Sequence, residues 1–164
     1  MMAARFRLLG LIAGAVVLLD QLTKVYIDRT FNLYDSLTVV PNFFDITYLR
    51  NKGAAFGILA DSAMRVPFFI GVSLLAVVII LWYFRQLPPE QTGQQVGLSL
   101  ILGGALGNLV DRVRLGEVID FLDVHWYRYH WPAFNVADSA ICVGVGLLLF
   151  CMWRMERREK GRKA

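Results

Sequence analysis

Four long apolar stretches constrain the fold of this chain more than any other feature of its sequence. They cover residues 6–22, 66–84, 96–110 and 134–153. An α-helix rises about 1.5 Å per residue, so roughly 20 residues cross the hydrocarbon core of a bilayer. The third stretch is short and contains Asn108, so it needs flanking residues to span. We predict an all-α integral membrane protein with four transmembrane helices, at about residues 6–26, 66–84, 94–113 and 134–153.

Composition and charge support a single membrane domain over residues 1–164. Apolar residues make up 57% of the chain, which exceeds the roughly half expected of a soluble protein. The basic residues behind the net charge of +4 gather at the two ends of the chain, rather than on a face that could bind nucleic acid. By the positive-inside rule both termini are cytoplasmic, and residues 29–65 and 113–133 form extracytoplasmic loops.

The first apolar stretch imitates a secretory signal peptide, because a basic start precedes the apolar run at residues 8–19. No small-x-small cleavage site follows this run, and Asp20, Thr23 and Lys24 come next. We therefore predict that the stretch is retained as a span. Pairs of small residues at four-residue spacing further predict close helix packing, although chance also produces such pairs: Gly10 with Gly14, Gly103 with Gly107, and Ala140 with Gly144.

The first outer loop contains two runs that favour β-structure. Residues 37–40 and 43–49 are rich in branched and aromatic side chains, and Pro41 and Asn42 separate them. A lone hairpin is marginal in water. We expect a small extracytoplasmic β-sheet that rests on the membrane surface or on the helices.

The predicted topology brings polar residues from separate segments to one level, beneath the outer interface. They are Asp20 and Lys24 of the first span, Asn108, Asp111 and Arg112 of the third, Asn135 and Asp138 of the fourth, and Asp120 of the last loop. An ionisable group costs about 2.5–3.5 kcal/mol at the centre of a membrane helix, so these side chains should face inward.

Spacing pairs some of these residues along a helix face. Asp20 lies four residues before Lys24, and Asn108 four before Arg112, with Asp111 beside them. For Asp20 and Lys24 a structural contact between helices is favoured over direct chemistry. A guanidinium at the lip of a pocket, such as that of Arg112, can hold a carboxylate, a lipid phosphate or a peptide carbonyl.

Asp120 and Asp138 lie in apolar surroundings, and no lysine or arginine is within five positions of either. Two carboxylates at low dielectric tend to share one proton, so the pair holds a base beside an acid. Such a pair can activate water against an amide and protonate the leaving nitrogen. The alternative is that each is a helix cap or a solvated charge. Asp138 lies one turn inside the predicted span and should cap poorly, which favours chemistry.

Five sequence motifs together resemble the lipoprotein signal peptidase (signal peptidase II) family of membrane aspartic peptidases. They are residues 20–24 (DQLTK), 51–57 (NKGAAFG), 103–112 (GGALGNLVDR), 118–121 (VIDF) and 134–139 (FNVADS). Each motif alone is modest, but five in order on the predicted spans are specific. The resemblance implies cleavage immediately before a diacylglyceryl-modified cysteine in prolipoproteins, in the bacterial inner membrane, at a site near its outer face. It also implies inhibition by globomycin, with no cofactor and no metal.

The same resemblance assigns roles to individual residues. Asp120 and Asp138 become the catalytic dyad. Residues that shape the site and hold the substrate are Asn51, Gly53, Asn108, Arg112 and Asn135, and residues that organise the site are Asp20, Lys24 and Asp111. We also expect residues 51–59 to close over the site, with glycines at 53 and 57 giving freedom to move.

Three other functions fit parts of the sequence. Carboxylates near a membrane surface can hold Mg²⁺ for phosphate transfer on lipid head groups. His125 and His130 offer a zinc site, but a third ligand and a nearby catalytic Glu are missing, and the aromatic segment 126–131 resembles an interfacial belt instead. Proton-coupled transport would use the buried Asp and Lys residues, but no inverted repeat is detectable.

Overall fold

The structure is a computed structural model that describes residues 2–53 and 64–163. It contains four helices, each long and apolar enough to cross a membrane, and a small antiparallel sheet, which confirms the predicted fold class. The helices are α1 (Met2–Thr30), α2 (Arg65–Gln86), α3 (Thr92–Leu115) and α4 (Val136–Lys163). The strands are β1 (Ser36–Val40), β2 (Phe44–Asn51), β3 (Val118–Trp126) and β4 (Tyr129–His130).

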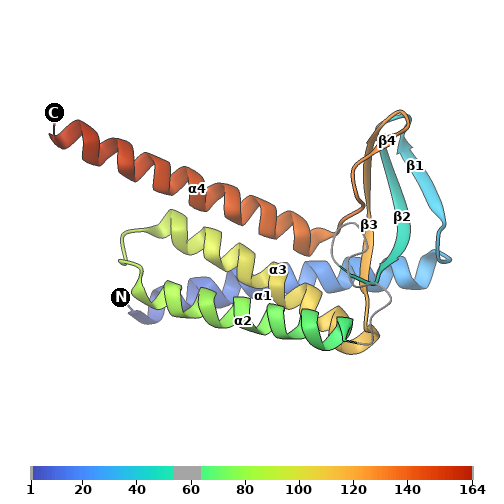
Figure 1. The fold of residues 1–164 in the computed structure, drawn as a ribbon, viewed down its shortest axis with the longest axis horizontal. Coiled ribbons are helices and arrows are strands. Elements are labelled where there is room, and N and C mark those ends of the chain that lie inside the picture. The colour runs from blue at the N-terminus through green and yellow to red at the C-terminus, as the bar shows by residue number, and fades with distance from the viewer. Residues whose placement is uncertain (1, 54–63, 164) are drawn as a thin grey trace.

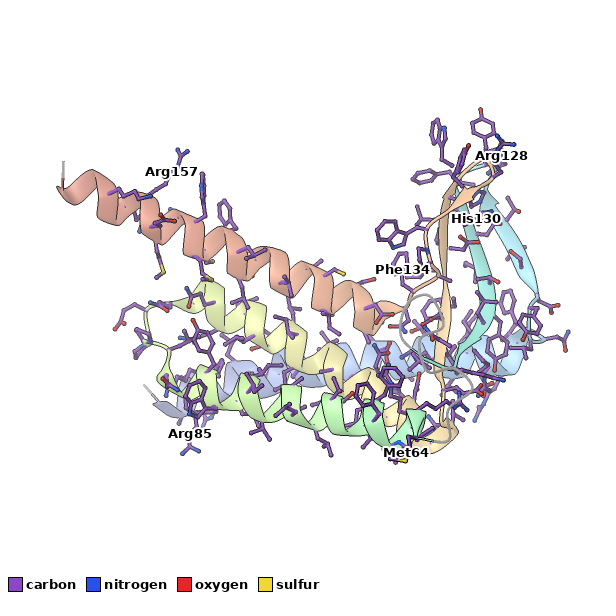
Figure 2. The ribbon with its side chains drawn as sticks, viewed as in Figure 1. Met64, Arg85, Arg128, His130, Phe134 and Arg157 are labelled. Atoms are coloured by element: carbon purple, nitrogen blue, oxygen red, sulfur yellow. The ribbon has the colours of Figure 1, made fainter. Side chains whose placement is uncertain are left out.

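The sheet stands across one end of the helix bundle, and both chain termini lie at the other end (Figure 1). The connection between α2 and α3 also lies at the end with the termini. Arg85 and Arg157 mark that end, whereas Arg128 and His130 lie at the far tip of the sheet (Figure 2). This arrangement agrees with two termini on one side of a membrane; which side that is stays a prediction.

The helices extend beyond the apolar stretches because their polar ends remain helical. The third helix makes up for its short apolar stretch in this way, since α3 runs from Thr92 to Leu115. Gly116 ends it in a left-handed conformation (φ 70°), and its N–H donates to the carbonyl of Arg112 at 3.1 Å. Leu87 ends α2 in an extended conformation, as expected for a residue before Pro88.

Glycines on α3 allow the neighbouring helices to approach closely. A Cβ at Gly104 would lie 2.3 Å from the carbonyl oxygen of Ala137 in α4, and one at Gly103 would lie 2.7 Å from Cβ of Val16 in α1. The predicted close packing is confirmed for Gly103, and equally for Gly107 and Gly144. It is wrong for Gly10 and Gly14, where an added Cβ would meet nothing within 4 Å.

The sheet has the strand order β1-β2-β3-β4, and all its pairs are antiparallel. The predicted hairpin of β1 and β2 is confirmed. The second outer segment is more ordered than the loop we predicted, because residues 118–126 form β3 and pair with β2. Asp120 lies opposite Leu49 and Val118 lies opposite Asn51. Asp120 therefore lies on a strand, with Asn51 on the strand next to it.

Candidate active site

Asp120 projects from β3 into a buried site, where an amide contacts each of its two carboxylate oxygens. Nδ2 of Asn51 donates to Oδ2 at 2.9 Å, and Nδ2 of Asn135 donates to Oδ1 at 2.8 Å. The side chain is only 4% exposed. The pKa of this carboxyl is raised from 3.8 to about 7, chiefly by burial; the nearby charge of Asp138 contributes to the rise, and the two amides oppose it.

Asp138 lies in the first turn of α4, and amide groups also hold both of its carboxylate oxygens. Nδ2 of Asn108 donates to Oδ1 at 2.7 Å, and the backbone N–H of Asn135 donates to Oδ2 at 3.3 Å. The backbone N–H of Asp138 returns a bond of 2.9 Å to Oδ1 of Asn135. This reciprocal arrangement is a capping box. The expectation that Asp138 caps poorly is therefore wrong, because α4 begins later than the predicted span.

Asn135 joins the two carboxylates. Its side-chain amide contacts Asp120 and its backbone N–H contacts Asp138, and the Asn135 side chain is fully buried. Asp138 also lies close enough to Asp120 to act on it electrostatically. Two acidic side chains from β3 and α4 thus meet around one asparagine. Such a pair can hold one proton between a base and an acid.

Lys24 is the centre of a buried polar network behind the two carboxylates, and it is 1% exposed. Its Nζ lies 2.9 Å from Oδ2 of Asp20, 2.9 Å from Oδ2 of Asp111 and 2.9 Å from Oδ1 of Asn108. All three ammonium protons therefore have acceptors. The predicted pairing of Asp20 with Lys24 is confirmed. Asn108 does not pair with Arg112 as its spacing indicated, because its amide contacts Lys24 and Asp138.

Backbone groups of the sheet and of α4 complete this network. The N–H of Ala137 donates to Oδ1 of Asp20 at 3.0 Å, and the N–H of Ile119 donates to Oδ2 of Asp111 at 3.2 Å. The carboxylate of Asp20 therefore fixes α4 against α1, and that of Asp111 fixes β3 against α3. Since Ile119 precedes Asp120 and Ala137 precedes Asp138, the network positions both acidic residues of the site.

Gln21 is part of the site, although sequence analysis did not select it. Its Nε2 lies 3.1 Å from Oδ2 of Asp20, 3.0 Å from Oδ1 of Asp111 and 3.2 Å from the carbonyl oxygen of Gly107. Its Oε1 accepts a bond of 3.2 Å from Arg114. The available signal was its place beside Asp20 in the first motif.

Arg112 lies next to the two carboxylates without touching them. Its guanidinium stacks over the ring of Phe69 in α2, 5.3 Å from the ring centroid. Asp138 and Asp120 both interact with it electrostatically. Within residues 2–53 and 64–163 the guanidinium forms no hydrogen bond or ion pair. Its position leaves a positive charge at the edge of the site, and Phe69 is a further residue that sequence analysis missed.

Asn51 positions both an acidic side chain and the start of the following segment. While its Nδ2 bonds to Asp120, its Oδ1 accepts a bond of 3.0 Å from the N–H of Gly53. Gly53 is buried. The predicted closing segment, residues 51–59 with a glycine at position 57, lies outside the described residues from position 54 onward.

The two histidines lie on the sheet, away from the acidic pair. His125 and His130 stack with ring centroids 4.5 Å apart, and Nδ1 of His130 lies 2.9 Å from Oδ2 of Asp123. Among the described residues, no three His, Cys, Asp or Glu side chains come together as metal ligands. The neighbouring aromatic residues Trp126, Tyr129 and Trp131 are exposed, and the interfacial belt expected of them stays a prediction.

Comparisons with known proteins agree over nearly the whole chain. The sequence profile of signal peptidase II, peptidase family A8, matches residues 12–154. A lipoprotein signal peptidase of Syntrophotalea carbinolica is 64% identical over 154 residues, which cover 94% of this chain and 96% of that protein. One of Geobacter sulfurreducens is 58% identical over 158 residues, covering 96% of this chain and 99% of that protein. A solved bacterial membrane enzyme has a TM-score of 0.80 at 40% identity, covering 88% of this chain and 86% of the other.

Proposed function

The chain belongs to the signal peptidase II family, and from that premise we propose that it is an aspartic endopeptidase acting on lipoprotein precursors. It removes the signal peptide from diacylglyceryl-modified prolipoproteins by cleaving before the lipidated cysteine. The observation that carries the proposal is that Asn135 contacts both Asp120 and Asp138, so two acidic side chains share one buried site.

The two carboxyl groups divide the chemistry between them. Asp120 is the more deeply buried, and its raised pKa of about 7 favours it as the group that holds the proton. Asp138 accepts hydrogen bonds from the Asn108 amide and from a backbone N–H, and it is the group that acts as the base. Asp138 takes a proton from water as the oxygen attacks the scissile carbonyl carbon. Asp120 gives its proton toward the leaving nitrogen as the carbon–nitrogen bond breaks.

The remaining site residues hold the substrate or support the acidic pair. Three asparagines orient the two carboxylates through hydrogen bonds from their side-chain amides: Asn51, Asn108 and Asn135. They also contact the substrate chain beside the carboxylates. The positive charge of Arg112 binds the peptide carbonyls near the cleavage point, and Gly53 holds Asn51 in place through its backbone N–H. Asp20, Lys24 and Asp111 organise the site, because their network anchors the residues that precede Asp120 and Asp138.

The position of the site suits a substrate that arrives from lipid. The family consists of multi-pass bacterial membrane proteins, and the acidic pair belongs to β3 and to the start of α4, which lie at the end opposite both termini (Figure 1). With the termini in the cytoplasm, residues 1–164 form one inner-membrane domain with its site near the outer face. A signal peptide helix and two acyl chains enter sideways while water reaches the site from outside. A globomycin-type inhibitor competes for this place.

A single cleavage assay tests the proposal. The full-length protein in detergent is given a prolipoprotein in lipidated and unlipidated form, with and without a metal chelator. We expect cleavage of the lipidated substrate directly before the modified cysteine, unchanged by the chelator. Cleavage at another position, or activity that a chelator removes, would contradict the proposed dyad and favour a metal-dependent reaction.

A further inference from the structure

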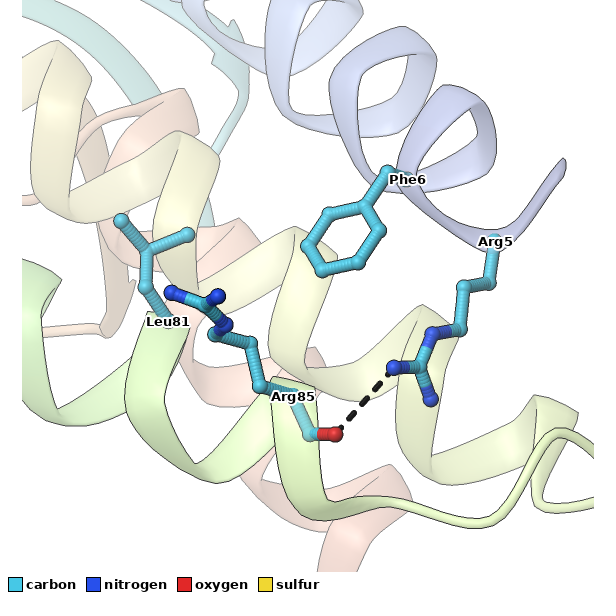
Figure 3. A pocket seen from close by; sticks show the side chains of 4 residues that line it. All are labelled: Arg5, Phe6, Leu81 and Arg85. Atoms are coloured by element: carbon cyan, nitrogen blue, oxygen red, sulfur yellow. Dashed lines mark hydrogen bonds between the residues drawn. The ribbon is translucent and has the colours of Figure 1, made fainter. Parts of the chain in front are cut away.

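A cavity near the termini contains two guanidinium groups and lies far from the acidic pair. Its volume is about 440 Å³, and it is lined by Arg5 and Phe6 of α1 and by Leu81 and Arg85 of α2. Figure 3 shows the Phe6 ring standing over the space between the two arginines. None of the residues assigned to the peptidase site lines this cavity, so that function does not account for it.

Arg5 is held in place by the end of α2. Its Nη1 donates to the carbonyl oxygen of Leu87 at 2.7 Å, and its Nη2 donates to that of Arg85 at 3.1 Å. The Nε of Arg5 is buried and has no hydrogen-bond partner, and the guanidinium lies 5.3 Å from the centroid of the Phe6 ring. A fixed and partly buried cation therefore forms one side of the cavity.

The side chain of Arg85 adds a second positive charge to the same space. It is exposed, and Figure 3 shows it folded back toward Leu81. Neither Arg5 nor Arg85 forms an ion pair with a carboxylate of the described residues. Two cations that face one cavity repel each other, and an anion between them removes this cost.

The walls and the depth of the cavity indicate what kind of anion it takes. Phe6 and Leu81 offer apolar surface, and exposed apolar side chains such as Leu11, Val78 and Trp82 continue along α1 and α2. Arg5 and Arg85 lie near the ends of their spans, at the level of lipid head groups. Basic pockets between transmembrane helices on the cytoplasmic side bind anionic lipid head groups.

We propose that this cavity binds the phosphate of an anionic phospholipid of the cytoplasmic leaflet. The guanidinium groups of Arg5 and Arg85 donate to the phosphate oxygens. The acyl chains of the lipid follow the apolar surface of α1 and α2. Because Arg5 joins α1 to the end of α2, the bound lipid stabilises this end of the bundle.

Lipid-dependent thermal unfolding tests the proposal. The full-length protein in neutral detergent is titrated with phosphatidylglycerol, with phosphatidylcholine of the same acyl chains, and with inorganic phosphate. Arg85→Gln removes one cation but keeps the backbone carbonyl to which Arg5 donates. Arg7→Gln is the matched control, because Arg7 is an exposed arginine of α1 that does not line the cavity.

We expect phosphatidylglycerol to raise the Tm of the wild type and of Arg7→Gln equally. Arg85→Gln should need about fivefold more of this lipid for half of the shift, the loss expected for one cation at a membrane surface. An equal shift with phosphatidylcholine would overturn the proposal, and so would an unchanged titration of Arg85→Gln or an equal loss in Arg7→Gln. If inorganic phosphate raises the Tm by the same amount, the cavity binds free phosphate and the proposal of a phospholipid ligand is wrong.

Discussion

Asn135 and Asp138 bond to each other in both directions at the start of α4. The backbone N–H of Asp138 donates to Oδ1 of Asn135 at 2.9 Å, and the backbone N–H of Asn135 donates to Oδ2 of Asp138 at 3.3 Å. The amide of Asn135 remains free to bond to Asp120 at 2.8 Å. The same residue thus begins the helix and brings the two acidic side chains together, so we expect stability and activity to be coupled at this position.

Replacing Asn135 by alanine tests this coupling. The change removes a helix cap and leaves Oδ1 of Asp120 without its amide, so we expect the free energy of unfolding to fall by about 2 kcal/mol. Asn51→Ala removes the other amide of Asp120 without affecting a cap, and we expect about half that loss. Both variants should lose most of their peptidase activity. Equal stability of the two variants in thermal unfolding would contradict the capping role.

Lys24→Met tests the network behind the site. The change leaves the carboxylates of Asp20 and Asp111 buried without their cation, which costs about 3–5 kcal/mol. Adding Asp111→Asn should restore part of the lost stability, because it removes one of the two unpaired charges. Lys160→Met is the control, since Lys160 pairs with Glu156 on the exposed surface of α4. If Lys24→Met unfolds at the same temperature as Lys160→Met, the network does not stabilise the fold.

Gly107→Ala tests the close approach of α1 and α3 at the site. The new Cβ would lie 2.6 Å from Oδ2 of Asp20, so either the carboxylate or the helix must shift. We expect a loss of about 1–3 kcal/mol together with reduced cleavage, as for overpacking elsewhere. Gly14→Ala should be neutral or slightly stabilising, because a Cβ there meets nothing within 4 Å. Thermal unfolding and cleavage are measured for both variants. If the two variants change stability and activity by the same amount, close packing at Gly107 is not the cause.

The pKa of Asp120 predicts how stability depends on pH. Burial raises the pKa of this carboxyl from 3.8 to about 7. A raised carboxyl pKa stabilises the folded state below the unfolded value, and this contribution is lost as the pH rises through the folded value. Wild type should therefore lose stability relative to Asp120→Asn between about pH 4 and about pH 7. A constant difference in Tm between the two proteins across this range would contradict the shift.

Hydropathy and helical spacing were sufficient to predict the helical part of the fold. Four apolar stretches indicated four helices, and the spacing of Asp20 and Lys24 indicated their pairing. Lys24 also pairs with Asp111, which comes from another helix, and no spacing along a single helix can reveal such a contact. For the same reason Gln21 and Phe69 were missed, since their contacts with the site cross between helices.

The sheet was predicted only where its pairing is local. The turn between β1 and β2 left a recognisable signal, whereas β3 pairs with a strand that precedes two complete helices. Its first four residues, 118–121, are all buried, so they lack the alternation that marks a half-exposed strand. Residues 118–126 form a strand because they pair with β2. This pairing also explains why Asp120 is fixed on a strand rather than carried by a loop.

The proposed mechanism requires Asp120 and Asp138 to carry out the cleavage together. Both acids are expected to be needed, because one must act as a base while the other supplies a proton. Asp123 provides a matched control, since it lies on the same strand as Asp120 but pairs with His130.

This requirement is tested by measuring cleavage of a lipidated prolipoprotein with three purified variants, each checked for folding in detergent: Asp120→Asn, Asp138→Asn and Asp123→Asn. The two-acid mechanism predicts that Asp123→Asn cleaves like the wild type, while each of the other two folded variants loses all detectable activity. Continued cleavage by folded Asp120→Asn or Asp138→Asn protein at a rate near that of the wild type would contradict it.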